Sequence, residues 1–319
     1  MTSHQAIGGY FELELPQKAE FHPNAIALNT ARNCLEYILL AREYKKVYIP
    51  RYTCEVVLEP FSKHGIEYEF YPINNRLEPQ VLPDLQQSEA FLYTNYYGLK
   101  QNVVRKLAER YGDKIIIDNA QAFYAPPVQG VDTFYSPRKF FGVPDGGYLY
   151  TTATPLTDLP RDISWPRMQQ LLQRIDESAE AGYHHFRKNS EALVNAPILR
   201  MSKLTQRILQ SIDYVQAKEQ RLKNYQVFHS ALKSLNLLHL ELGCDDVPMV
   251  YPFLTTDETL RQRLINNRIF VATYWPNVLQ WSPENSTENQ LAKQLIPLPI
   301  DQRYNETDMQ IIFNTIYTS

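Results

Sequence analysis

Lys139 is the residue whose type and neighbours most directly suggest covalent chemistry. It lies in the segment SPRKFFGVPDGG (residues 136–147), which contains three of the eleven glycines and two prolines. A loop of this composition is rigid and closely packed. We expect Phe140 and Phe141 to exclude water from the lysine and so favour the neutral amine that Schiff-base formation requires. The alternative is an ordinary surface lysine beside a turn.

Asp118 is a second candidate for chemistry, because it ends the apolar run KIIID (residues 114–118). Ligands of open α/β sheets bind just outside the carboxyl ends of the strands. A carboxylate at this position can face a cationic ring nitrogen or a metal ion. The alternative is a helix N-cap, a common role for aspartate after a strand.

Thr30 begins a third candidate segment, TARNCL (residues 30–35), which leads into an apolar helix that ends near Tyr44. Thr30 can cap this helix, and the free amide groups of the first turn, together with Arg32, can bind a phosphate. The alternative is an ordinary N-cap followed by a solvated arginine.

Strand and helix patterns alternate in the first half of the chain, and this order favours a doubly wound α/β unit. The three isoleucines of 115–117 predict a strand buried on both faces, as in a parallel sheet covered by helices. Glycines follow both predicted helices, where helices commonly end. The predicted strands are 46–50, 66–73, 90–97, 114–118 and 147–151, and the predicted helices are 53–64 and 102–111.

After about residue 160 the pattern becomes mainly helical and then mixed. We therefore expect a large domain at 1–160, a helical connecting segment at 161–235 and a small C-terminal α+β domain at 236–319. The predicted helices are 168–180, 183–192, 198–235, 256–266 and 308–316, and the predicted strands are 237–240, 247–253 and 269–274.

Taken in order along the chain, these segments resemble the fold-type I pyridoxal-phosphate (PLP) enzymes, and among them the DegT/StrS family of sugar aminotransferases. The family pattern Asp-x-x-Gln/His is matched at 118–121, and Pro-x-Lys-x-x-Gly…Asp-Gly-Gly at 137–147. The resemblance covers roughly residues 24–316. It implies a three-layer large domain with a mostly parallel sheet and a smaller α+β domain. Further stretches that fit are 30–35, 49–53, 95–98, 269–276 and 298–299.

The resemblance also implies roles for individual residues. Lys139 would attach the cofactor covalently and later transfer a proton. Asp118 would keep the pyridine nitrogen protonated, so that the ring can accept electrons, and Gln121 would contact the side of the ring that carries the 3-hydroxyl. The residues implied to hold the phosphate are Thr30, Ala31 and Arg32.

Two positions depart from the family pattern. The family usually has a phosphate-binding serine five residues before the lysine, where this chain has Phe134, so Ser136 or Thr133 would have to replace it. The family also usually stacks an aromatic side chain on the cofactor from a stretch that here contains Cys54. Tyr52 is the nearby aromatic residue that could take this place.

The resemblance implies an aminotransferase that moves an amino group from a glutamate-like donor to a keto sugar. The sugar would be nucleotide-linked and serve amino-sugar or surface polysaccharide biosynthesis. A homodimer with its active site at the interface is implied as well. The alternative is a non-catalytic member of the fold that acts in binding or assembly. The sequence shows no clear clamp for a substrate carboxylate, since we expect Arg221 and Asn224 to lie on a solvated helix face. We expect Trp275 to lie in the core or an interface.

Composition narrows the remaining possibilities. The net charge of −3 argues against a nucleic-acid partner held by a basic surface. No run of 18 apolar residues predicts a membrane span, and residues 1–16 do not resemble a signal peptide. The three cysteines form no CxxC pair, and His184 and His185 have no partner pattern, so we expect no metal site. A cytoplasmic protein is expected.

Overall fold

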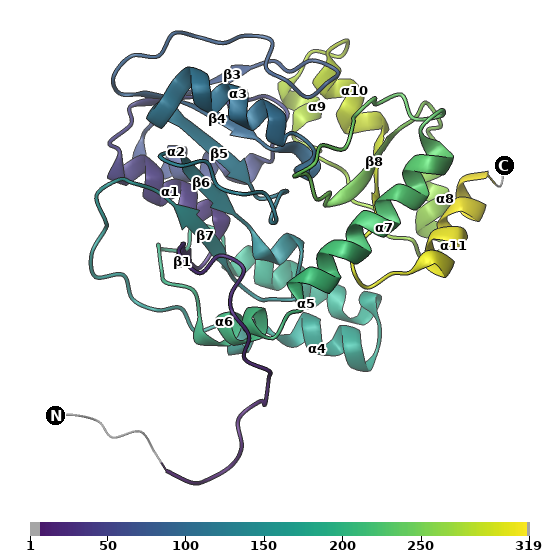
Figure 1. Cartoon of the computed structure of the whole chain (residues 1–319), viewed down its shortest axis with the longest axis horizontal. Helices are drawn as coiled ribbons and strands as arrows, with labels where there is room; N and C mark the ends of the chain where they lie inside the picture. Colours follow the sequence, from purple (N-terminus) through teal and green to yellow (C-terminus); the bar gives the residue numbers. More distant parts are fainter. Residues whose placement is uncertain (1–6, 318–319) are drawn as a thin grey trace.

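A seven-stranded sheet forms the centre of the first half of the chain in the computed structural model, which describes residues 7–317 (Figure 1). Strands β3, β2, β4, β5 and β6 are parallel, and β7 is antiparallel to both of its neighbours. The expected mostly parallel sheet is therefore confirmed. In spatial order the strands are β1 (Ile26–Leu28), β7 (Gly147–Tyr150), β6 (Asp132–Tyr135), β5 (Ile115–Asn119), β4 (Glu89–Thr94), β2 (Lys46–Pro50) and β3 (Glu67–Tyr71).

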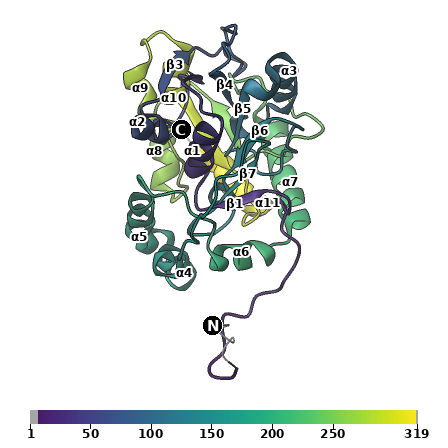
Figure 2. The same ribbon diagram turned by 90° about the vertical axis from the view of Figure 1, so that its left-hand side faces the viewer.

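The three isoleucines of β5 explain why helices cover both faces of this sheet. Ile115, Ile116 and Ile117 are all completely buried. Successive side chains of a strand point to opposite faces. Accordingly, Ile115 and Ile117 share a core with α3 (Gln101–Tyr111), while Ile116 shares one with α1 (Ala31–Ala41) and α2 (Glu59–His64). Figure 2 shows α1 and α2 on one side of the sheet and α3 on the other.

The predicted ends of two helices are confirmed. The segment expected as helix 53–64 is a short 3-10 turn, η1 (Glu55–Leu58), continued by α2. Gly65 ends α2 with φ of 63°, a left-handed conformation that glycine adopts without strain. Gly112 ends α3 with φ of 58°.

The second half of the chain combines helices with a two-stranded antiparallel sheet. The helices are α4 (Gln169–Asp176), α5 (Ala179–Ala192), α6 (Lys203–Gln210), α7 (Tyr214–Leu232), α8 (Leu260–Asn266), α9 (Val278–Trp281), α10 (Thr287–Gln294) and α11 (Glu306–Tyr317). The strands are β8 (Val250–Leu254) and β9 (Leu295–Pro299). The remaining 3-10 turns are η2 (Tyr96–Gly98), η3 (Gly112–Lys114), η4 (Pro137–Lys139) and η5 (Trp165–Arg167).

Two helix predictions in this half need correction. The expected helix 198–235 is interrupted between α6 and α7, where the side chain of Asp213 accepts a hydrogen bond from the Gln216 amide (3.0 Å) and starts a new helix. The expected gap at 181–182 does not exist, because α5 runs through Gly182. A Cβ atom there would lie 2.8 Å from the Gln170 carbonyl oxygen, so glycine allows α4 and α5 to pack closely.

Two strand predictions are wrong, and at both stretches side chains take part of the backbone hydrogen bonding that a strand would use. Next to 237–240, the Asn236 side chain accepts from the Leu254 amide (2.9 Å) and donates to the Pro252 carbonyl (2.8 Å). These two bonds use backbone groups at the edge of β8. At 269–274, Arg261 donates to the Ala272 carbonyl (2.6 Å). Both stretches are irregular.

Residues 1–6 and 318–319 lie outside the described residues. They include part of the segment 1–16, which we do not expect to be a signal peptide, and the end of the expected small domain. Among residues 7–317, no helix is long and apolar enough to cross a lipid bilayer.

His22 anchors the N-terminal segment inside an aromatic cluster. It is 3% exposed, and its ring nitrogens lie 2.9 Å from the Phe123 carbonyl oxygen and 3.2 Å from the Tyr150 hydroxyl. The ring of Tyr135 lies against the imidazole, with 4.3 Å between the centroids. Burial lowers the pKa of His22 from 6.5 to about 4, although the Phe123 carbonyl partly opposes this effect.

We expect the free energy of unfolding to fall as the pH decreases from 6.5 to 4. In this range the unfolded chain protonates His22 and the folded chain does not, which lowers stability by about 3 kcal/mol at pH 4. Urea titrations at several pH values should show a shallower pH dependence for His22→Gln than for the wild type. The exposed His239→Gln serves as the control, and equal slopes for wild type and His22→Gln would contradict the prediction.

Candidate active site

The predicted site residues meet at one cavity of about 200 Å³, at the carboxyl ends of the parallel strands and the start of α1. One stretch of the second half of the chain also reaches this region, since Tyr274 and Trp275 belong to its wall. All of the predicted residues except Tyr52 line the cavity: Thr30, Ala31, Arg32, Asp118, Gln121, Ser136 and Lys139.

Asp118 is held at the end of β5 by its neighbours. One carboxylate oxygen accepts from the Ala120 amide (2.8 Å), and the other lies 3.5 Å from the Thr94 hydroxyl on β4. Burial raises the pKa of the carboxyl, and the positive charge of Lys139 partly offsets this rise. A turn rather than a helix follows β5, so the alternative of a helix N-cap is wrong.

Gln121 presents an unused hydrogen-bond donor to the cavity. Its side-chain oxygen accepts from the Tyr97 amide (3.0 Å), which fixes the orientation of the amide group. Its side-chain nitrogen is buried and has no partner within the described residues. A buried donor without a partner destabilises the fold by about 1–3 kcal/mol. The position therefore suits a ligand oxygen.

The start of α1 forms the end of the cavity that suits a phosphate. Thr30 caps the helix by accepting from the Asn33 amide (2.9 Å). The other amides of a first turn have no partner within the helix. Gly147 makes this approach possible, because a Cβ atom there would lie 2.5 Å from the Thr30 backbone and 2.7 Å from the Ala31 nitrogen.

Arg32 lines the cavity, but its guanidinium is already bonded elsewhere. One terminal nitrogen donates to Glu59 (2.5 Å) and to the Leu193 carbonyl (3.0 Å), while Nε is buried without a partner. The ion pair with Glu59 neutralises part of the charge that the sequence assigned to a phosphate. The backbone of the first turn is therefore the main phosphate-binding element that the geometry offers.

Lys139 ends η4 and is exposed to solvent, so the expected exclusion of water by its neighbours is wrong. Phe140 and Phe141 pack away from it against Phe123, with ring centroids 5.7 Å and 5.0 Å apart. Within the described residues, the Lys139 amine has no hydrogen-bond or ion-pair partner. The neighbouring Arg138 does lose water, and burial lowers its pKa to about 10.

Of the residues at or near the positions that depart from the family pattern, some line the cavity and one does not. Phe134 lines the cavity from β6, and Ser136 lines it with 7% exposure. Cys54 lines it as well. Tyr52 does not, because it is completely buried behind the wall, where its hydroxyl bonds that of Tyr97 (2.9 Å).

The aromatic side chains of the cavity come instead from a segment that the sequence assigned to the core or an interface. Trp275 and Tyr274 line the cavity, and the Trp275 ring meets the Tyr52 ring edge-on at 4.9 Å. Asn277 donates to the Thr53 carbonyl (2.9 Å) and ties this segment to the first half of the chain. The match of 269–276 to the family pattern was the available signal.

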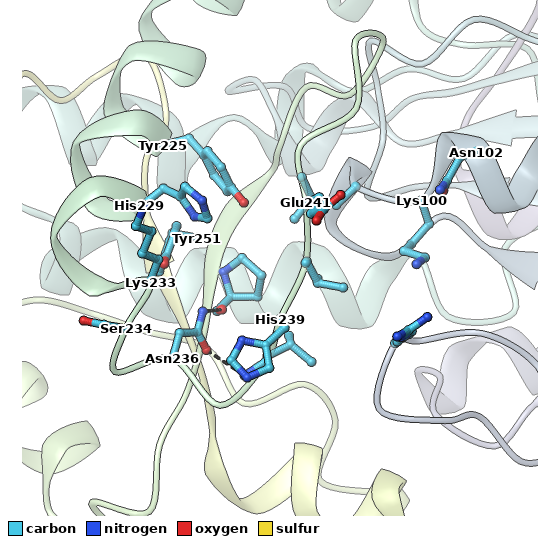
Figure 3. A pocket seen from close by; sticks show the side chains of 15 residues that line it. Lys100, Asn102, Tyr225, His229, Lys233, Ser234, Asn236, His239, Glu241 and Tyr251 are labelled. Atoms are coloured by element: carbon cyan, nitrogen blue, oxygen red, sulfur yellow. Dashed lines mark hydrogen bonds between the residues drawn. The ribbon is translucent and has the colours of Figure 1, made fainter.

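A larger cavity of about 600 Å³ contains none of the predicted residues. Figure 3 shows Tyr225, His229 and Lys233 on one side of it and Lys100 and Asn102 on the other. The Lys100 amine is bonded to Glu78 (3.1 Å). The smaller cavity is the better candidate, because Asp118, Gln121 and Lys139, which the sequence marked for chemistry, line it together.

The chemistry of the smaller cavity fits PLP. Asp118 can face a protonated ring nitrogen, the free Gln121 donor can meet a ring hydroxyl, and Lys139 can reach an aldehyde carbon. The start of α1 provides the anion-binding end. Within residues 7–317, no cluster of histidine, cysteine and acidic side chains is arranged to hold a metal ion.

Comparison with solved structures reveals a similar architecture. An aminotransferase of the DegT DnrJ EryC1 StrS type from Brucella abortus gives a TM-score of 0.64 at 17% identity, over 92% of this chain and 84% of that one. The sugar aminotransferase CalS13 from Micromonospora echinospora gives 0.61 at 14%, over 92% and 87%. NtdA from Bacillus subtilis, solved with bound cofactor PMP, gives 0.61 at 16%, over 92% and 73%. No protein-family model and no curated protein matches the sequence.

At these identities the likeness establishes the fold. The chain has the fold of the fold-type I PLP aminotransferases, and the resemblance to DegT/StrS enzymes that the sequence suggested is matched by these structures.

We expect Gly147→Ala to lower the free energy of unfolding by about 2 kcal/mol or more, because its Cβ would collide with the backbone of Thr30. Gly142→Ala is the matched control, since the nearest atom to a Cβ there is 3.6 Å away, in the flexible side chain of Leu171. Urea unfolding of both variants measures the difference. Equal stability of the two would contradict the close packing of β7 on α1.

Proposed function

We propose that this chain is a PLP-dependent aminotransferase that transfers an amino group from a glutamate-like amino acid to a keto sugar. One observation carries this proposal: Lys139, Asp118 and the unpartnered amide of Gln121 converge on one cavity.

PLP bound in this cavity would supply an electron-accepting ring. The Asp118 carboxylate, fixed by the Ala120 amide, would keep the ring nitrogen protonated. Gln121 would donate to a ring oxygen. The amides of Thr30 and Ala31 would bind the phosphate, together with two further residues that line the cavity: Arg32 and Ser136.

Lys139 would both attach the cofactor and move the proton. Its amine lines the cavity and has no hydrogen-bond or ion-pair partner within the described residues, so no neighbouring group holds it away from a bound amino acid. Tyr52 supports the site from behind, through the edge of Trp275 rather than by stacking on the ring.

The acceptor that we propose is a nucleotide-linked keto sugar used in amino-sugar or surface polysaccharide biosynthesis. The sequence resemblance and the sugar aminotransferases among the similar structures support this substrate class. Amination assays with a panel of nucleotide-linked keto sugars and glutamate test it, and free keto sugars serve as the comparison.

A non-catalytic role in binding or assembly is the second candidate. Phe134 and Cys54 favour it, because they occupy the positions where the family has its phosphate-binding serine and its stacking aromatic. The two candidates differ in a single-turnover experiment, since only an aminotransferase converts its bound cofactor when glutamate is added.

We expect the purified protein to take up PLP and turn yellow, with an absorbance in the near-visible range that Lys139→Ala lacks, because only this amine is placed to bond the cofactor. The exposed Lys188→Ala is the control and should remain yellow. A wild type that stays colourless with added PLP would rule out the proposed function.

We also propose a homodimer with the active site near the interface. Three apolar side chains of the stretch 163–172, which contains η5 and the start of α4, are exposed to solvent: Ile163 (66%), Trp165 (72%) and Leu172 (53%). Neighbouring exposed apolar groups commonly mark a protein interface. Sedimentation should give twice the mass of the chain, and Trp165→Glu should shift the protein to monomer. A monomeric wild type would refute the dimer.

A further inference from the structure

A third cavity, of about 630 Å³, also reaches Lys139. It shares Arg138 and Lys139 with the cofactor cavity, so the two spaces meet at the proposed reacting amine. We call it the arginine cavity. Its polar lining residues are Arg138, Lys139, Gln170, Arg174, Arg221, Asp301, Gln302 and Arg303.

The charges of this lining are strongly unbalanced. Asp301 is the single carboxylate among them, and it is paired with Arg303 through two contacts of 2.7 and 2.9 Å. Within the described residues, Arg138, Arg174 and Arg221 form no ion pair. The cavity therefore has a net positive charge, which attracts an anion.

Arg221 is the buried charge of the arginine cavity. It is 1% exposed and donates to the carbonyls of Met249 (3.0 Å) and Phe140 (3.4 Å). Its Nε is buried without a partner, and burial lowers its pKa to about 10. The sequence placed this residue on a solvated helix face. That expectation is wrong, because this face of α7 packs against β8 and the loop after Lys139.

Asp301 acts on Arg221 through its charge but forms its ion pair with Arg303, so Arg221 has no ion-pair partner of its own within the described residues and a bound anion would stabilise this buried charge. Arg221 and Lys139 line the same cavity, and the Arg221 guanidinium sits over the ring of Phe140, the residue after Lys139, at 4.6 Å. An anion that pairs with Arg221 would thus lie in the space next to the proposed reacting amine.

The rest of the lining indicates which kind of anion fits. Apolar walls suit methylene groups, and the side-chain oxygens of Gln170 and Gln302, which are buried without a partner among the described residues, can accept from an ammonium or hydroxyl group of the ligand. A short aliphatic chain that ends in a carboxylate meets both the apolar walls and the arginines. The apolar side chains of the wall are Phe140, Phe141, Leu171, Ile175 and Phe186.

We propose that the arginine cavity binds the side-chain carboxylate of a dicarboxylic amino donor, with Arg221 at its base and Arg174 at its rim. The inference rests on the proposed function, because the donor must bring its amine to the atom that Lys139 serves. Planar guanidinium groups match a carboxylate through paired hydrogen bonds.

Calorimetric titration of the full chain loaded with PLP tests the proposal. Glutarate and pentanoate share a five-carbon chain but differ by one carboxylate, and neither carries an amine that could react. We expect glutarate to bind at least about tenfold more tightly than pentanoate, since a charge-assisted hydrogen bond contributes on this scale.

Substitutions assign the binding to the arginines. Arg174→Gln and Arg221→Gln should each weaken glutarate binding by about fivefold to tenfold. Arg187→Gln is the matched control, because Arg187 lies on α5, pairs with Glu191 and is absent from the lining. If Arg221→Gln does not fold, the charge reversal Arg174→Glu at the exposed rim decides the question through the same measurement.

Three results would overturn the proposal: equal binding of glutarate and pentanoate, tighter binding of methyl phosphate than of glutarate, or wild-type affinity for glutarate in the folded arginine variants. Absorbance of the same samples reports PLP uptake independently. A colourless protein that still binds glutarate through Arg174 would refute the proposed function and retain the anion subsite. A yellow protein that does not bind glutarate through Arg174 would refute the anion subsite and retain the proposed function.

Discussion

The burial of Asp118 at the end of the central strand is the constraint on which the site depends. A carboxylate that loses water is stabilised only by hydrogen bonds and nearby positive charge, and here these come from the Ala120 amide and Lys139. The parallel register places Thr94 of β4 and Phe134 of β6 on either side of it. The sheet thus determines where a cationic ring can bind, and the surrounding loops determine what else that ring meets.

Glycine is required at two of the backbone contacts that enclose this site. Of the eleven glycines, Gly147 lets β7 approach the start of α1, and Gly98 lets the turn after β4 approach the second half of the chain. A Cβ atom at Gly98 would lie 2.5 Å from the Val247 carbonyl oxygen, and its φ is 71°. The phosphate-binding end and the junction between the two halves therefore both require a residue without a side chain.

The sequence predicted what depends on neighbours along the chain. The triple isoleucine of β5 and the glycine ends of α2 and α3 follow from local patterns, and so does the set of residues around Lys139. Predictions from the sequence failed where contacts between distant segments determine the structure. The solvation of Lys139 depends on Phe123, the burial of Arg221 depends on how α7 packs, and the irregular path of 269–274 depends on a side chain from α8. None of these contacts leaves a periodic signal in the sequence.

This division also separates the proposed cofactor site from the proposed substrate site. The groups that fit PLP all come from the first half of the chain, where motifs of fixed spacing carry the chemistry. The arginine cavity draws Arg174, Arg221 and Asp301 from three separate segments of the second half. A substrate-binding cavity assembled in this way exists only once both halves have packed together. Its residues can therefore vary with the substrate while the sheet and its buried carboxylate stay unchanged.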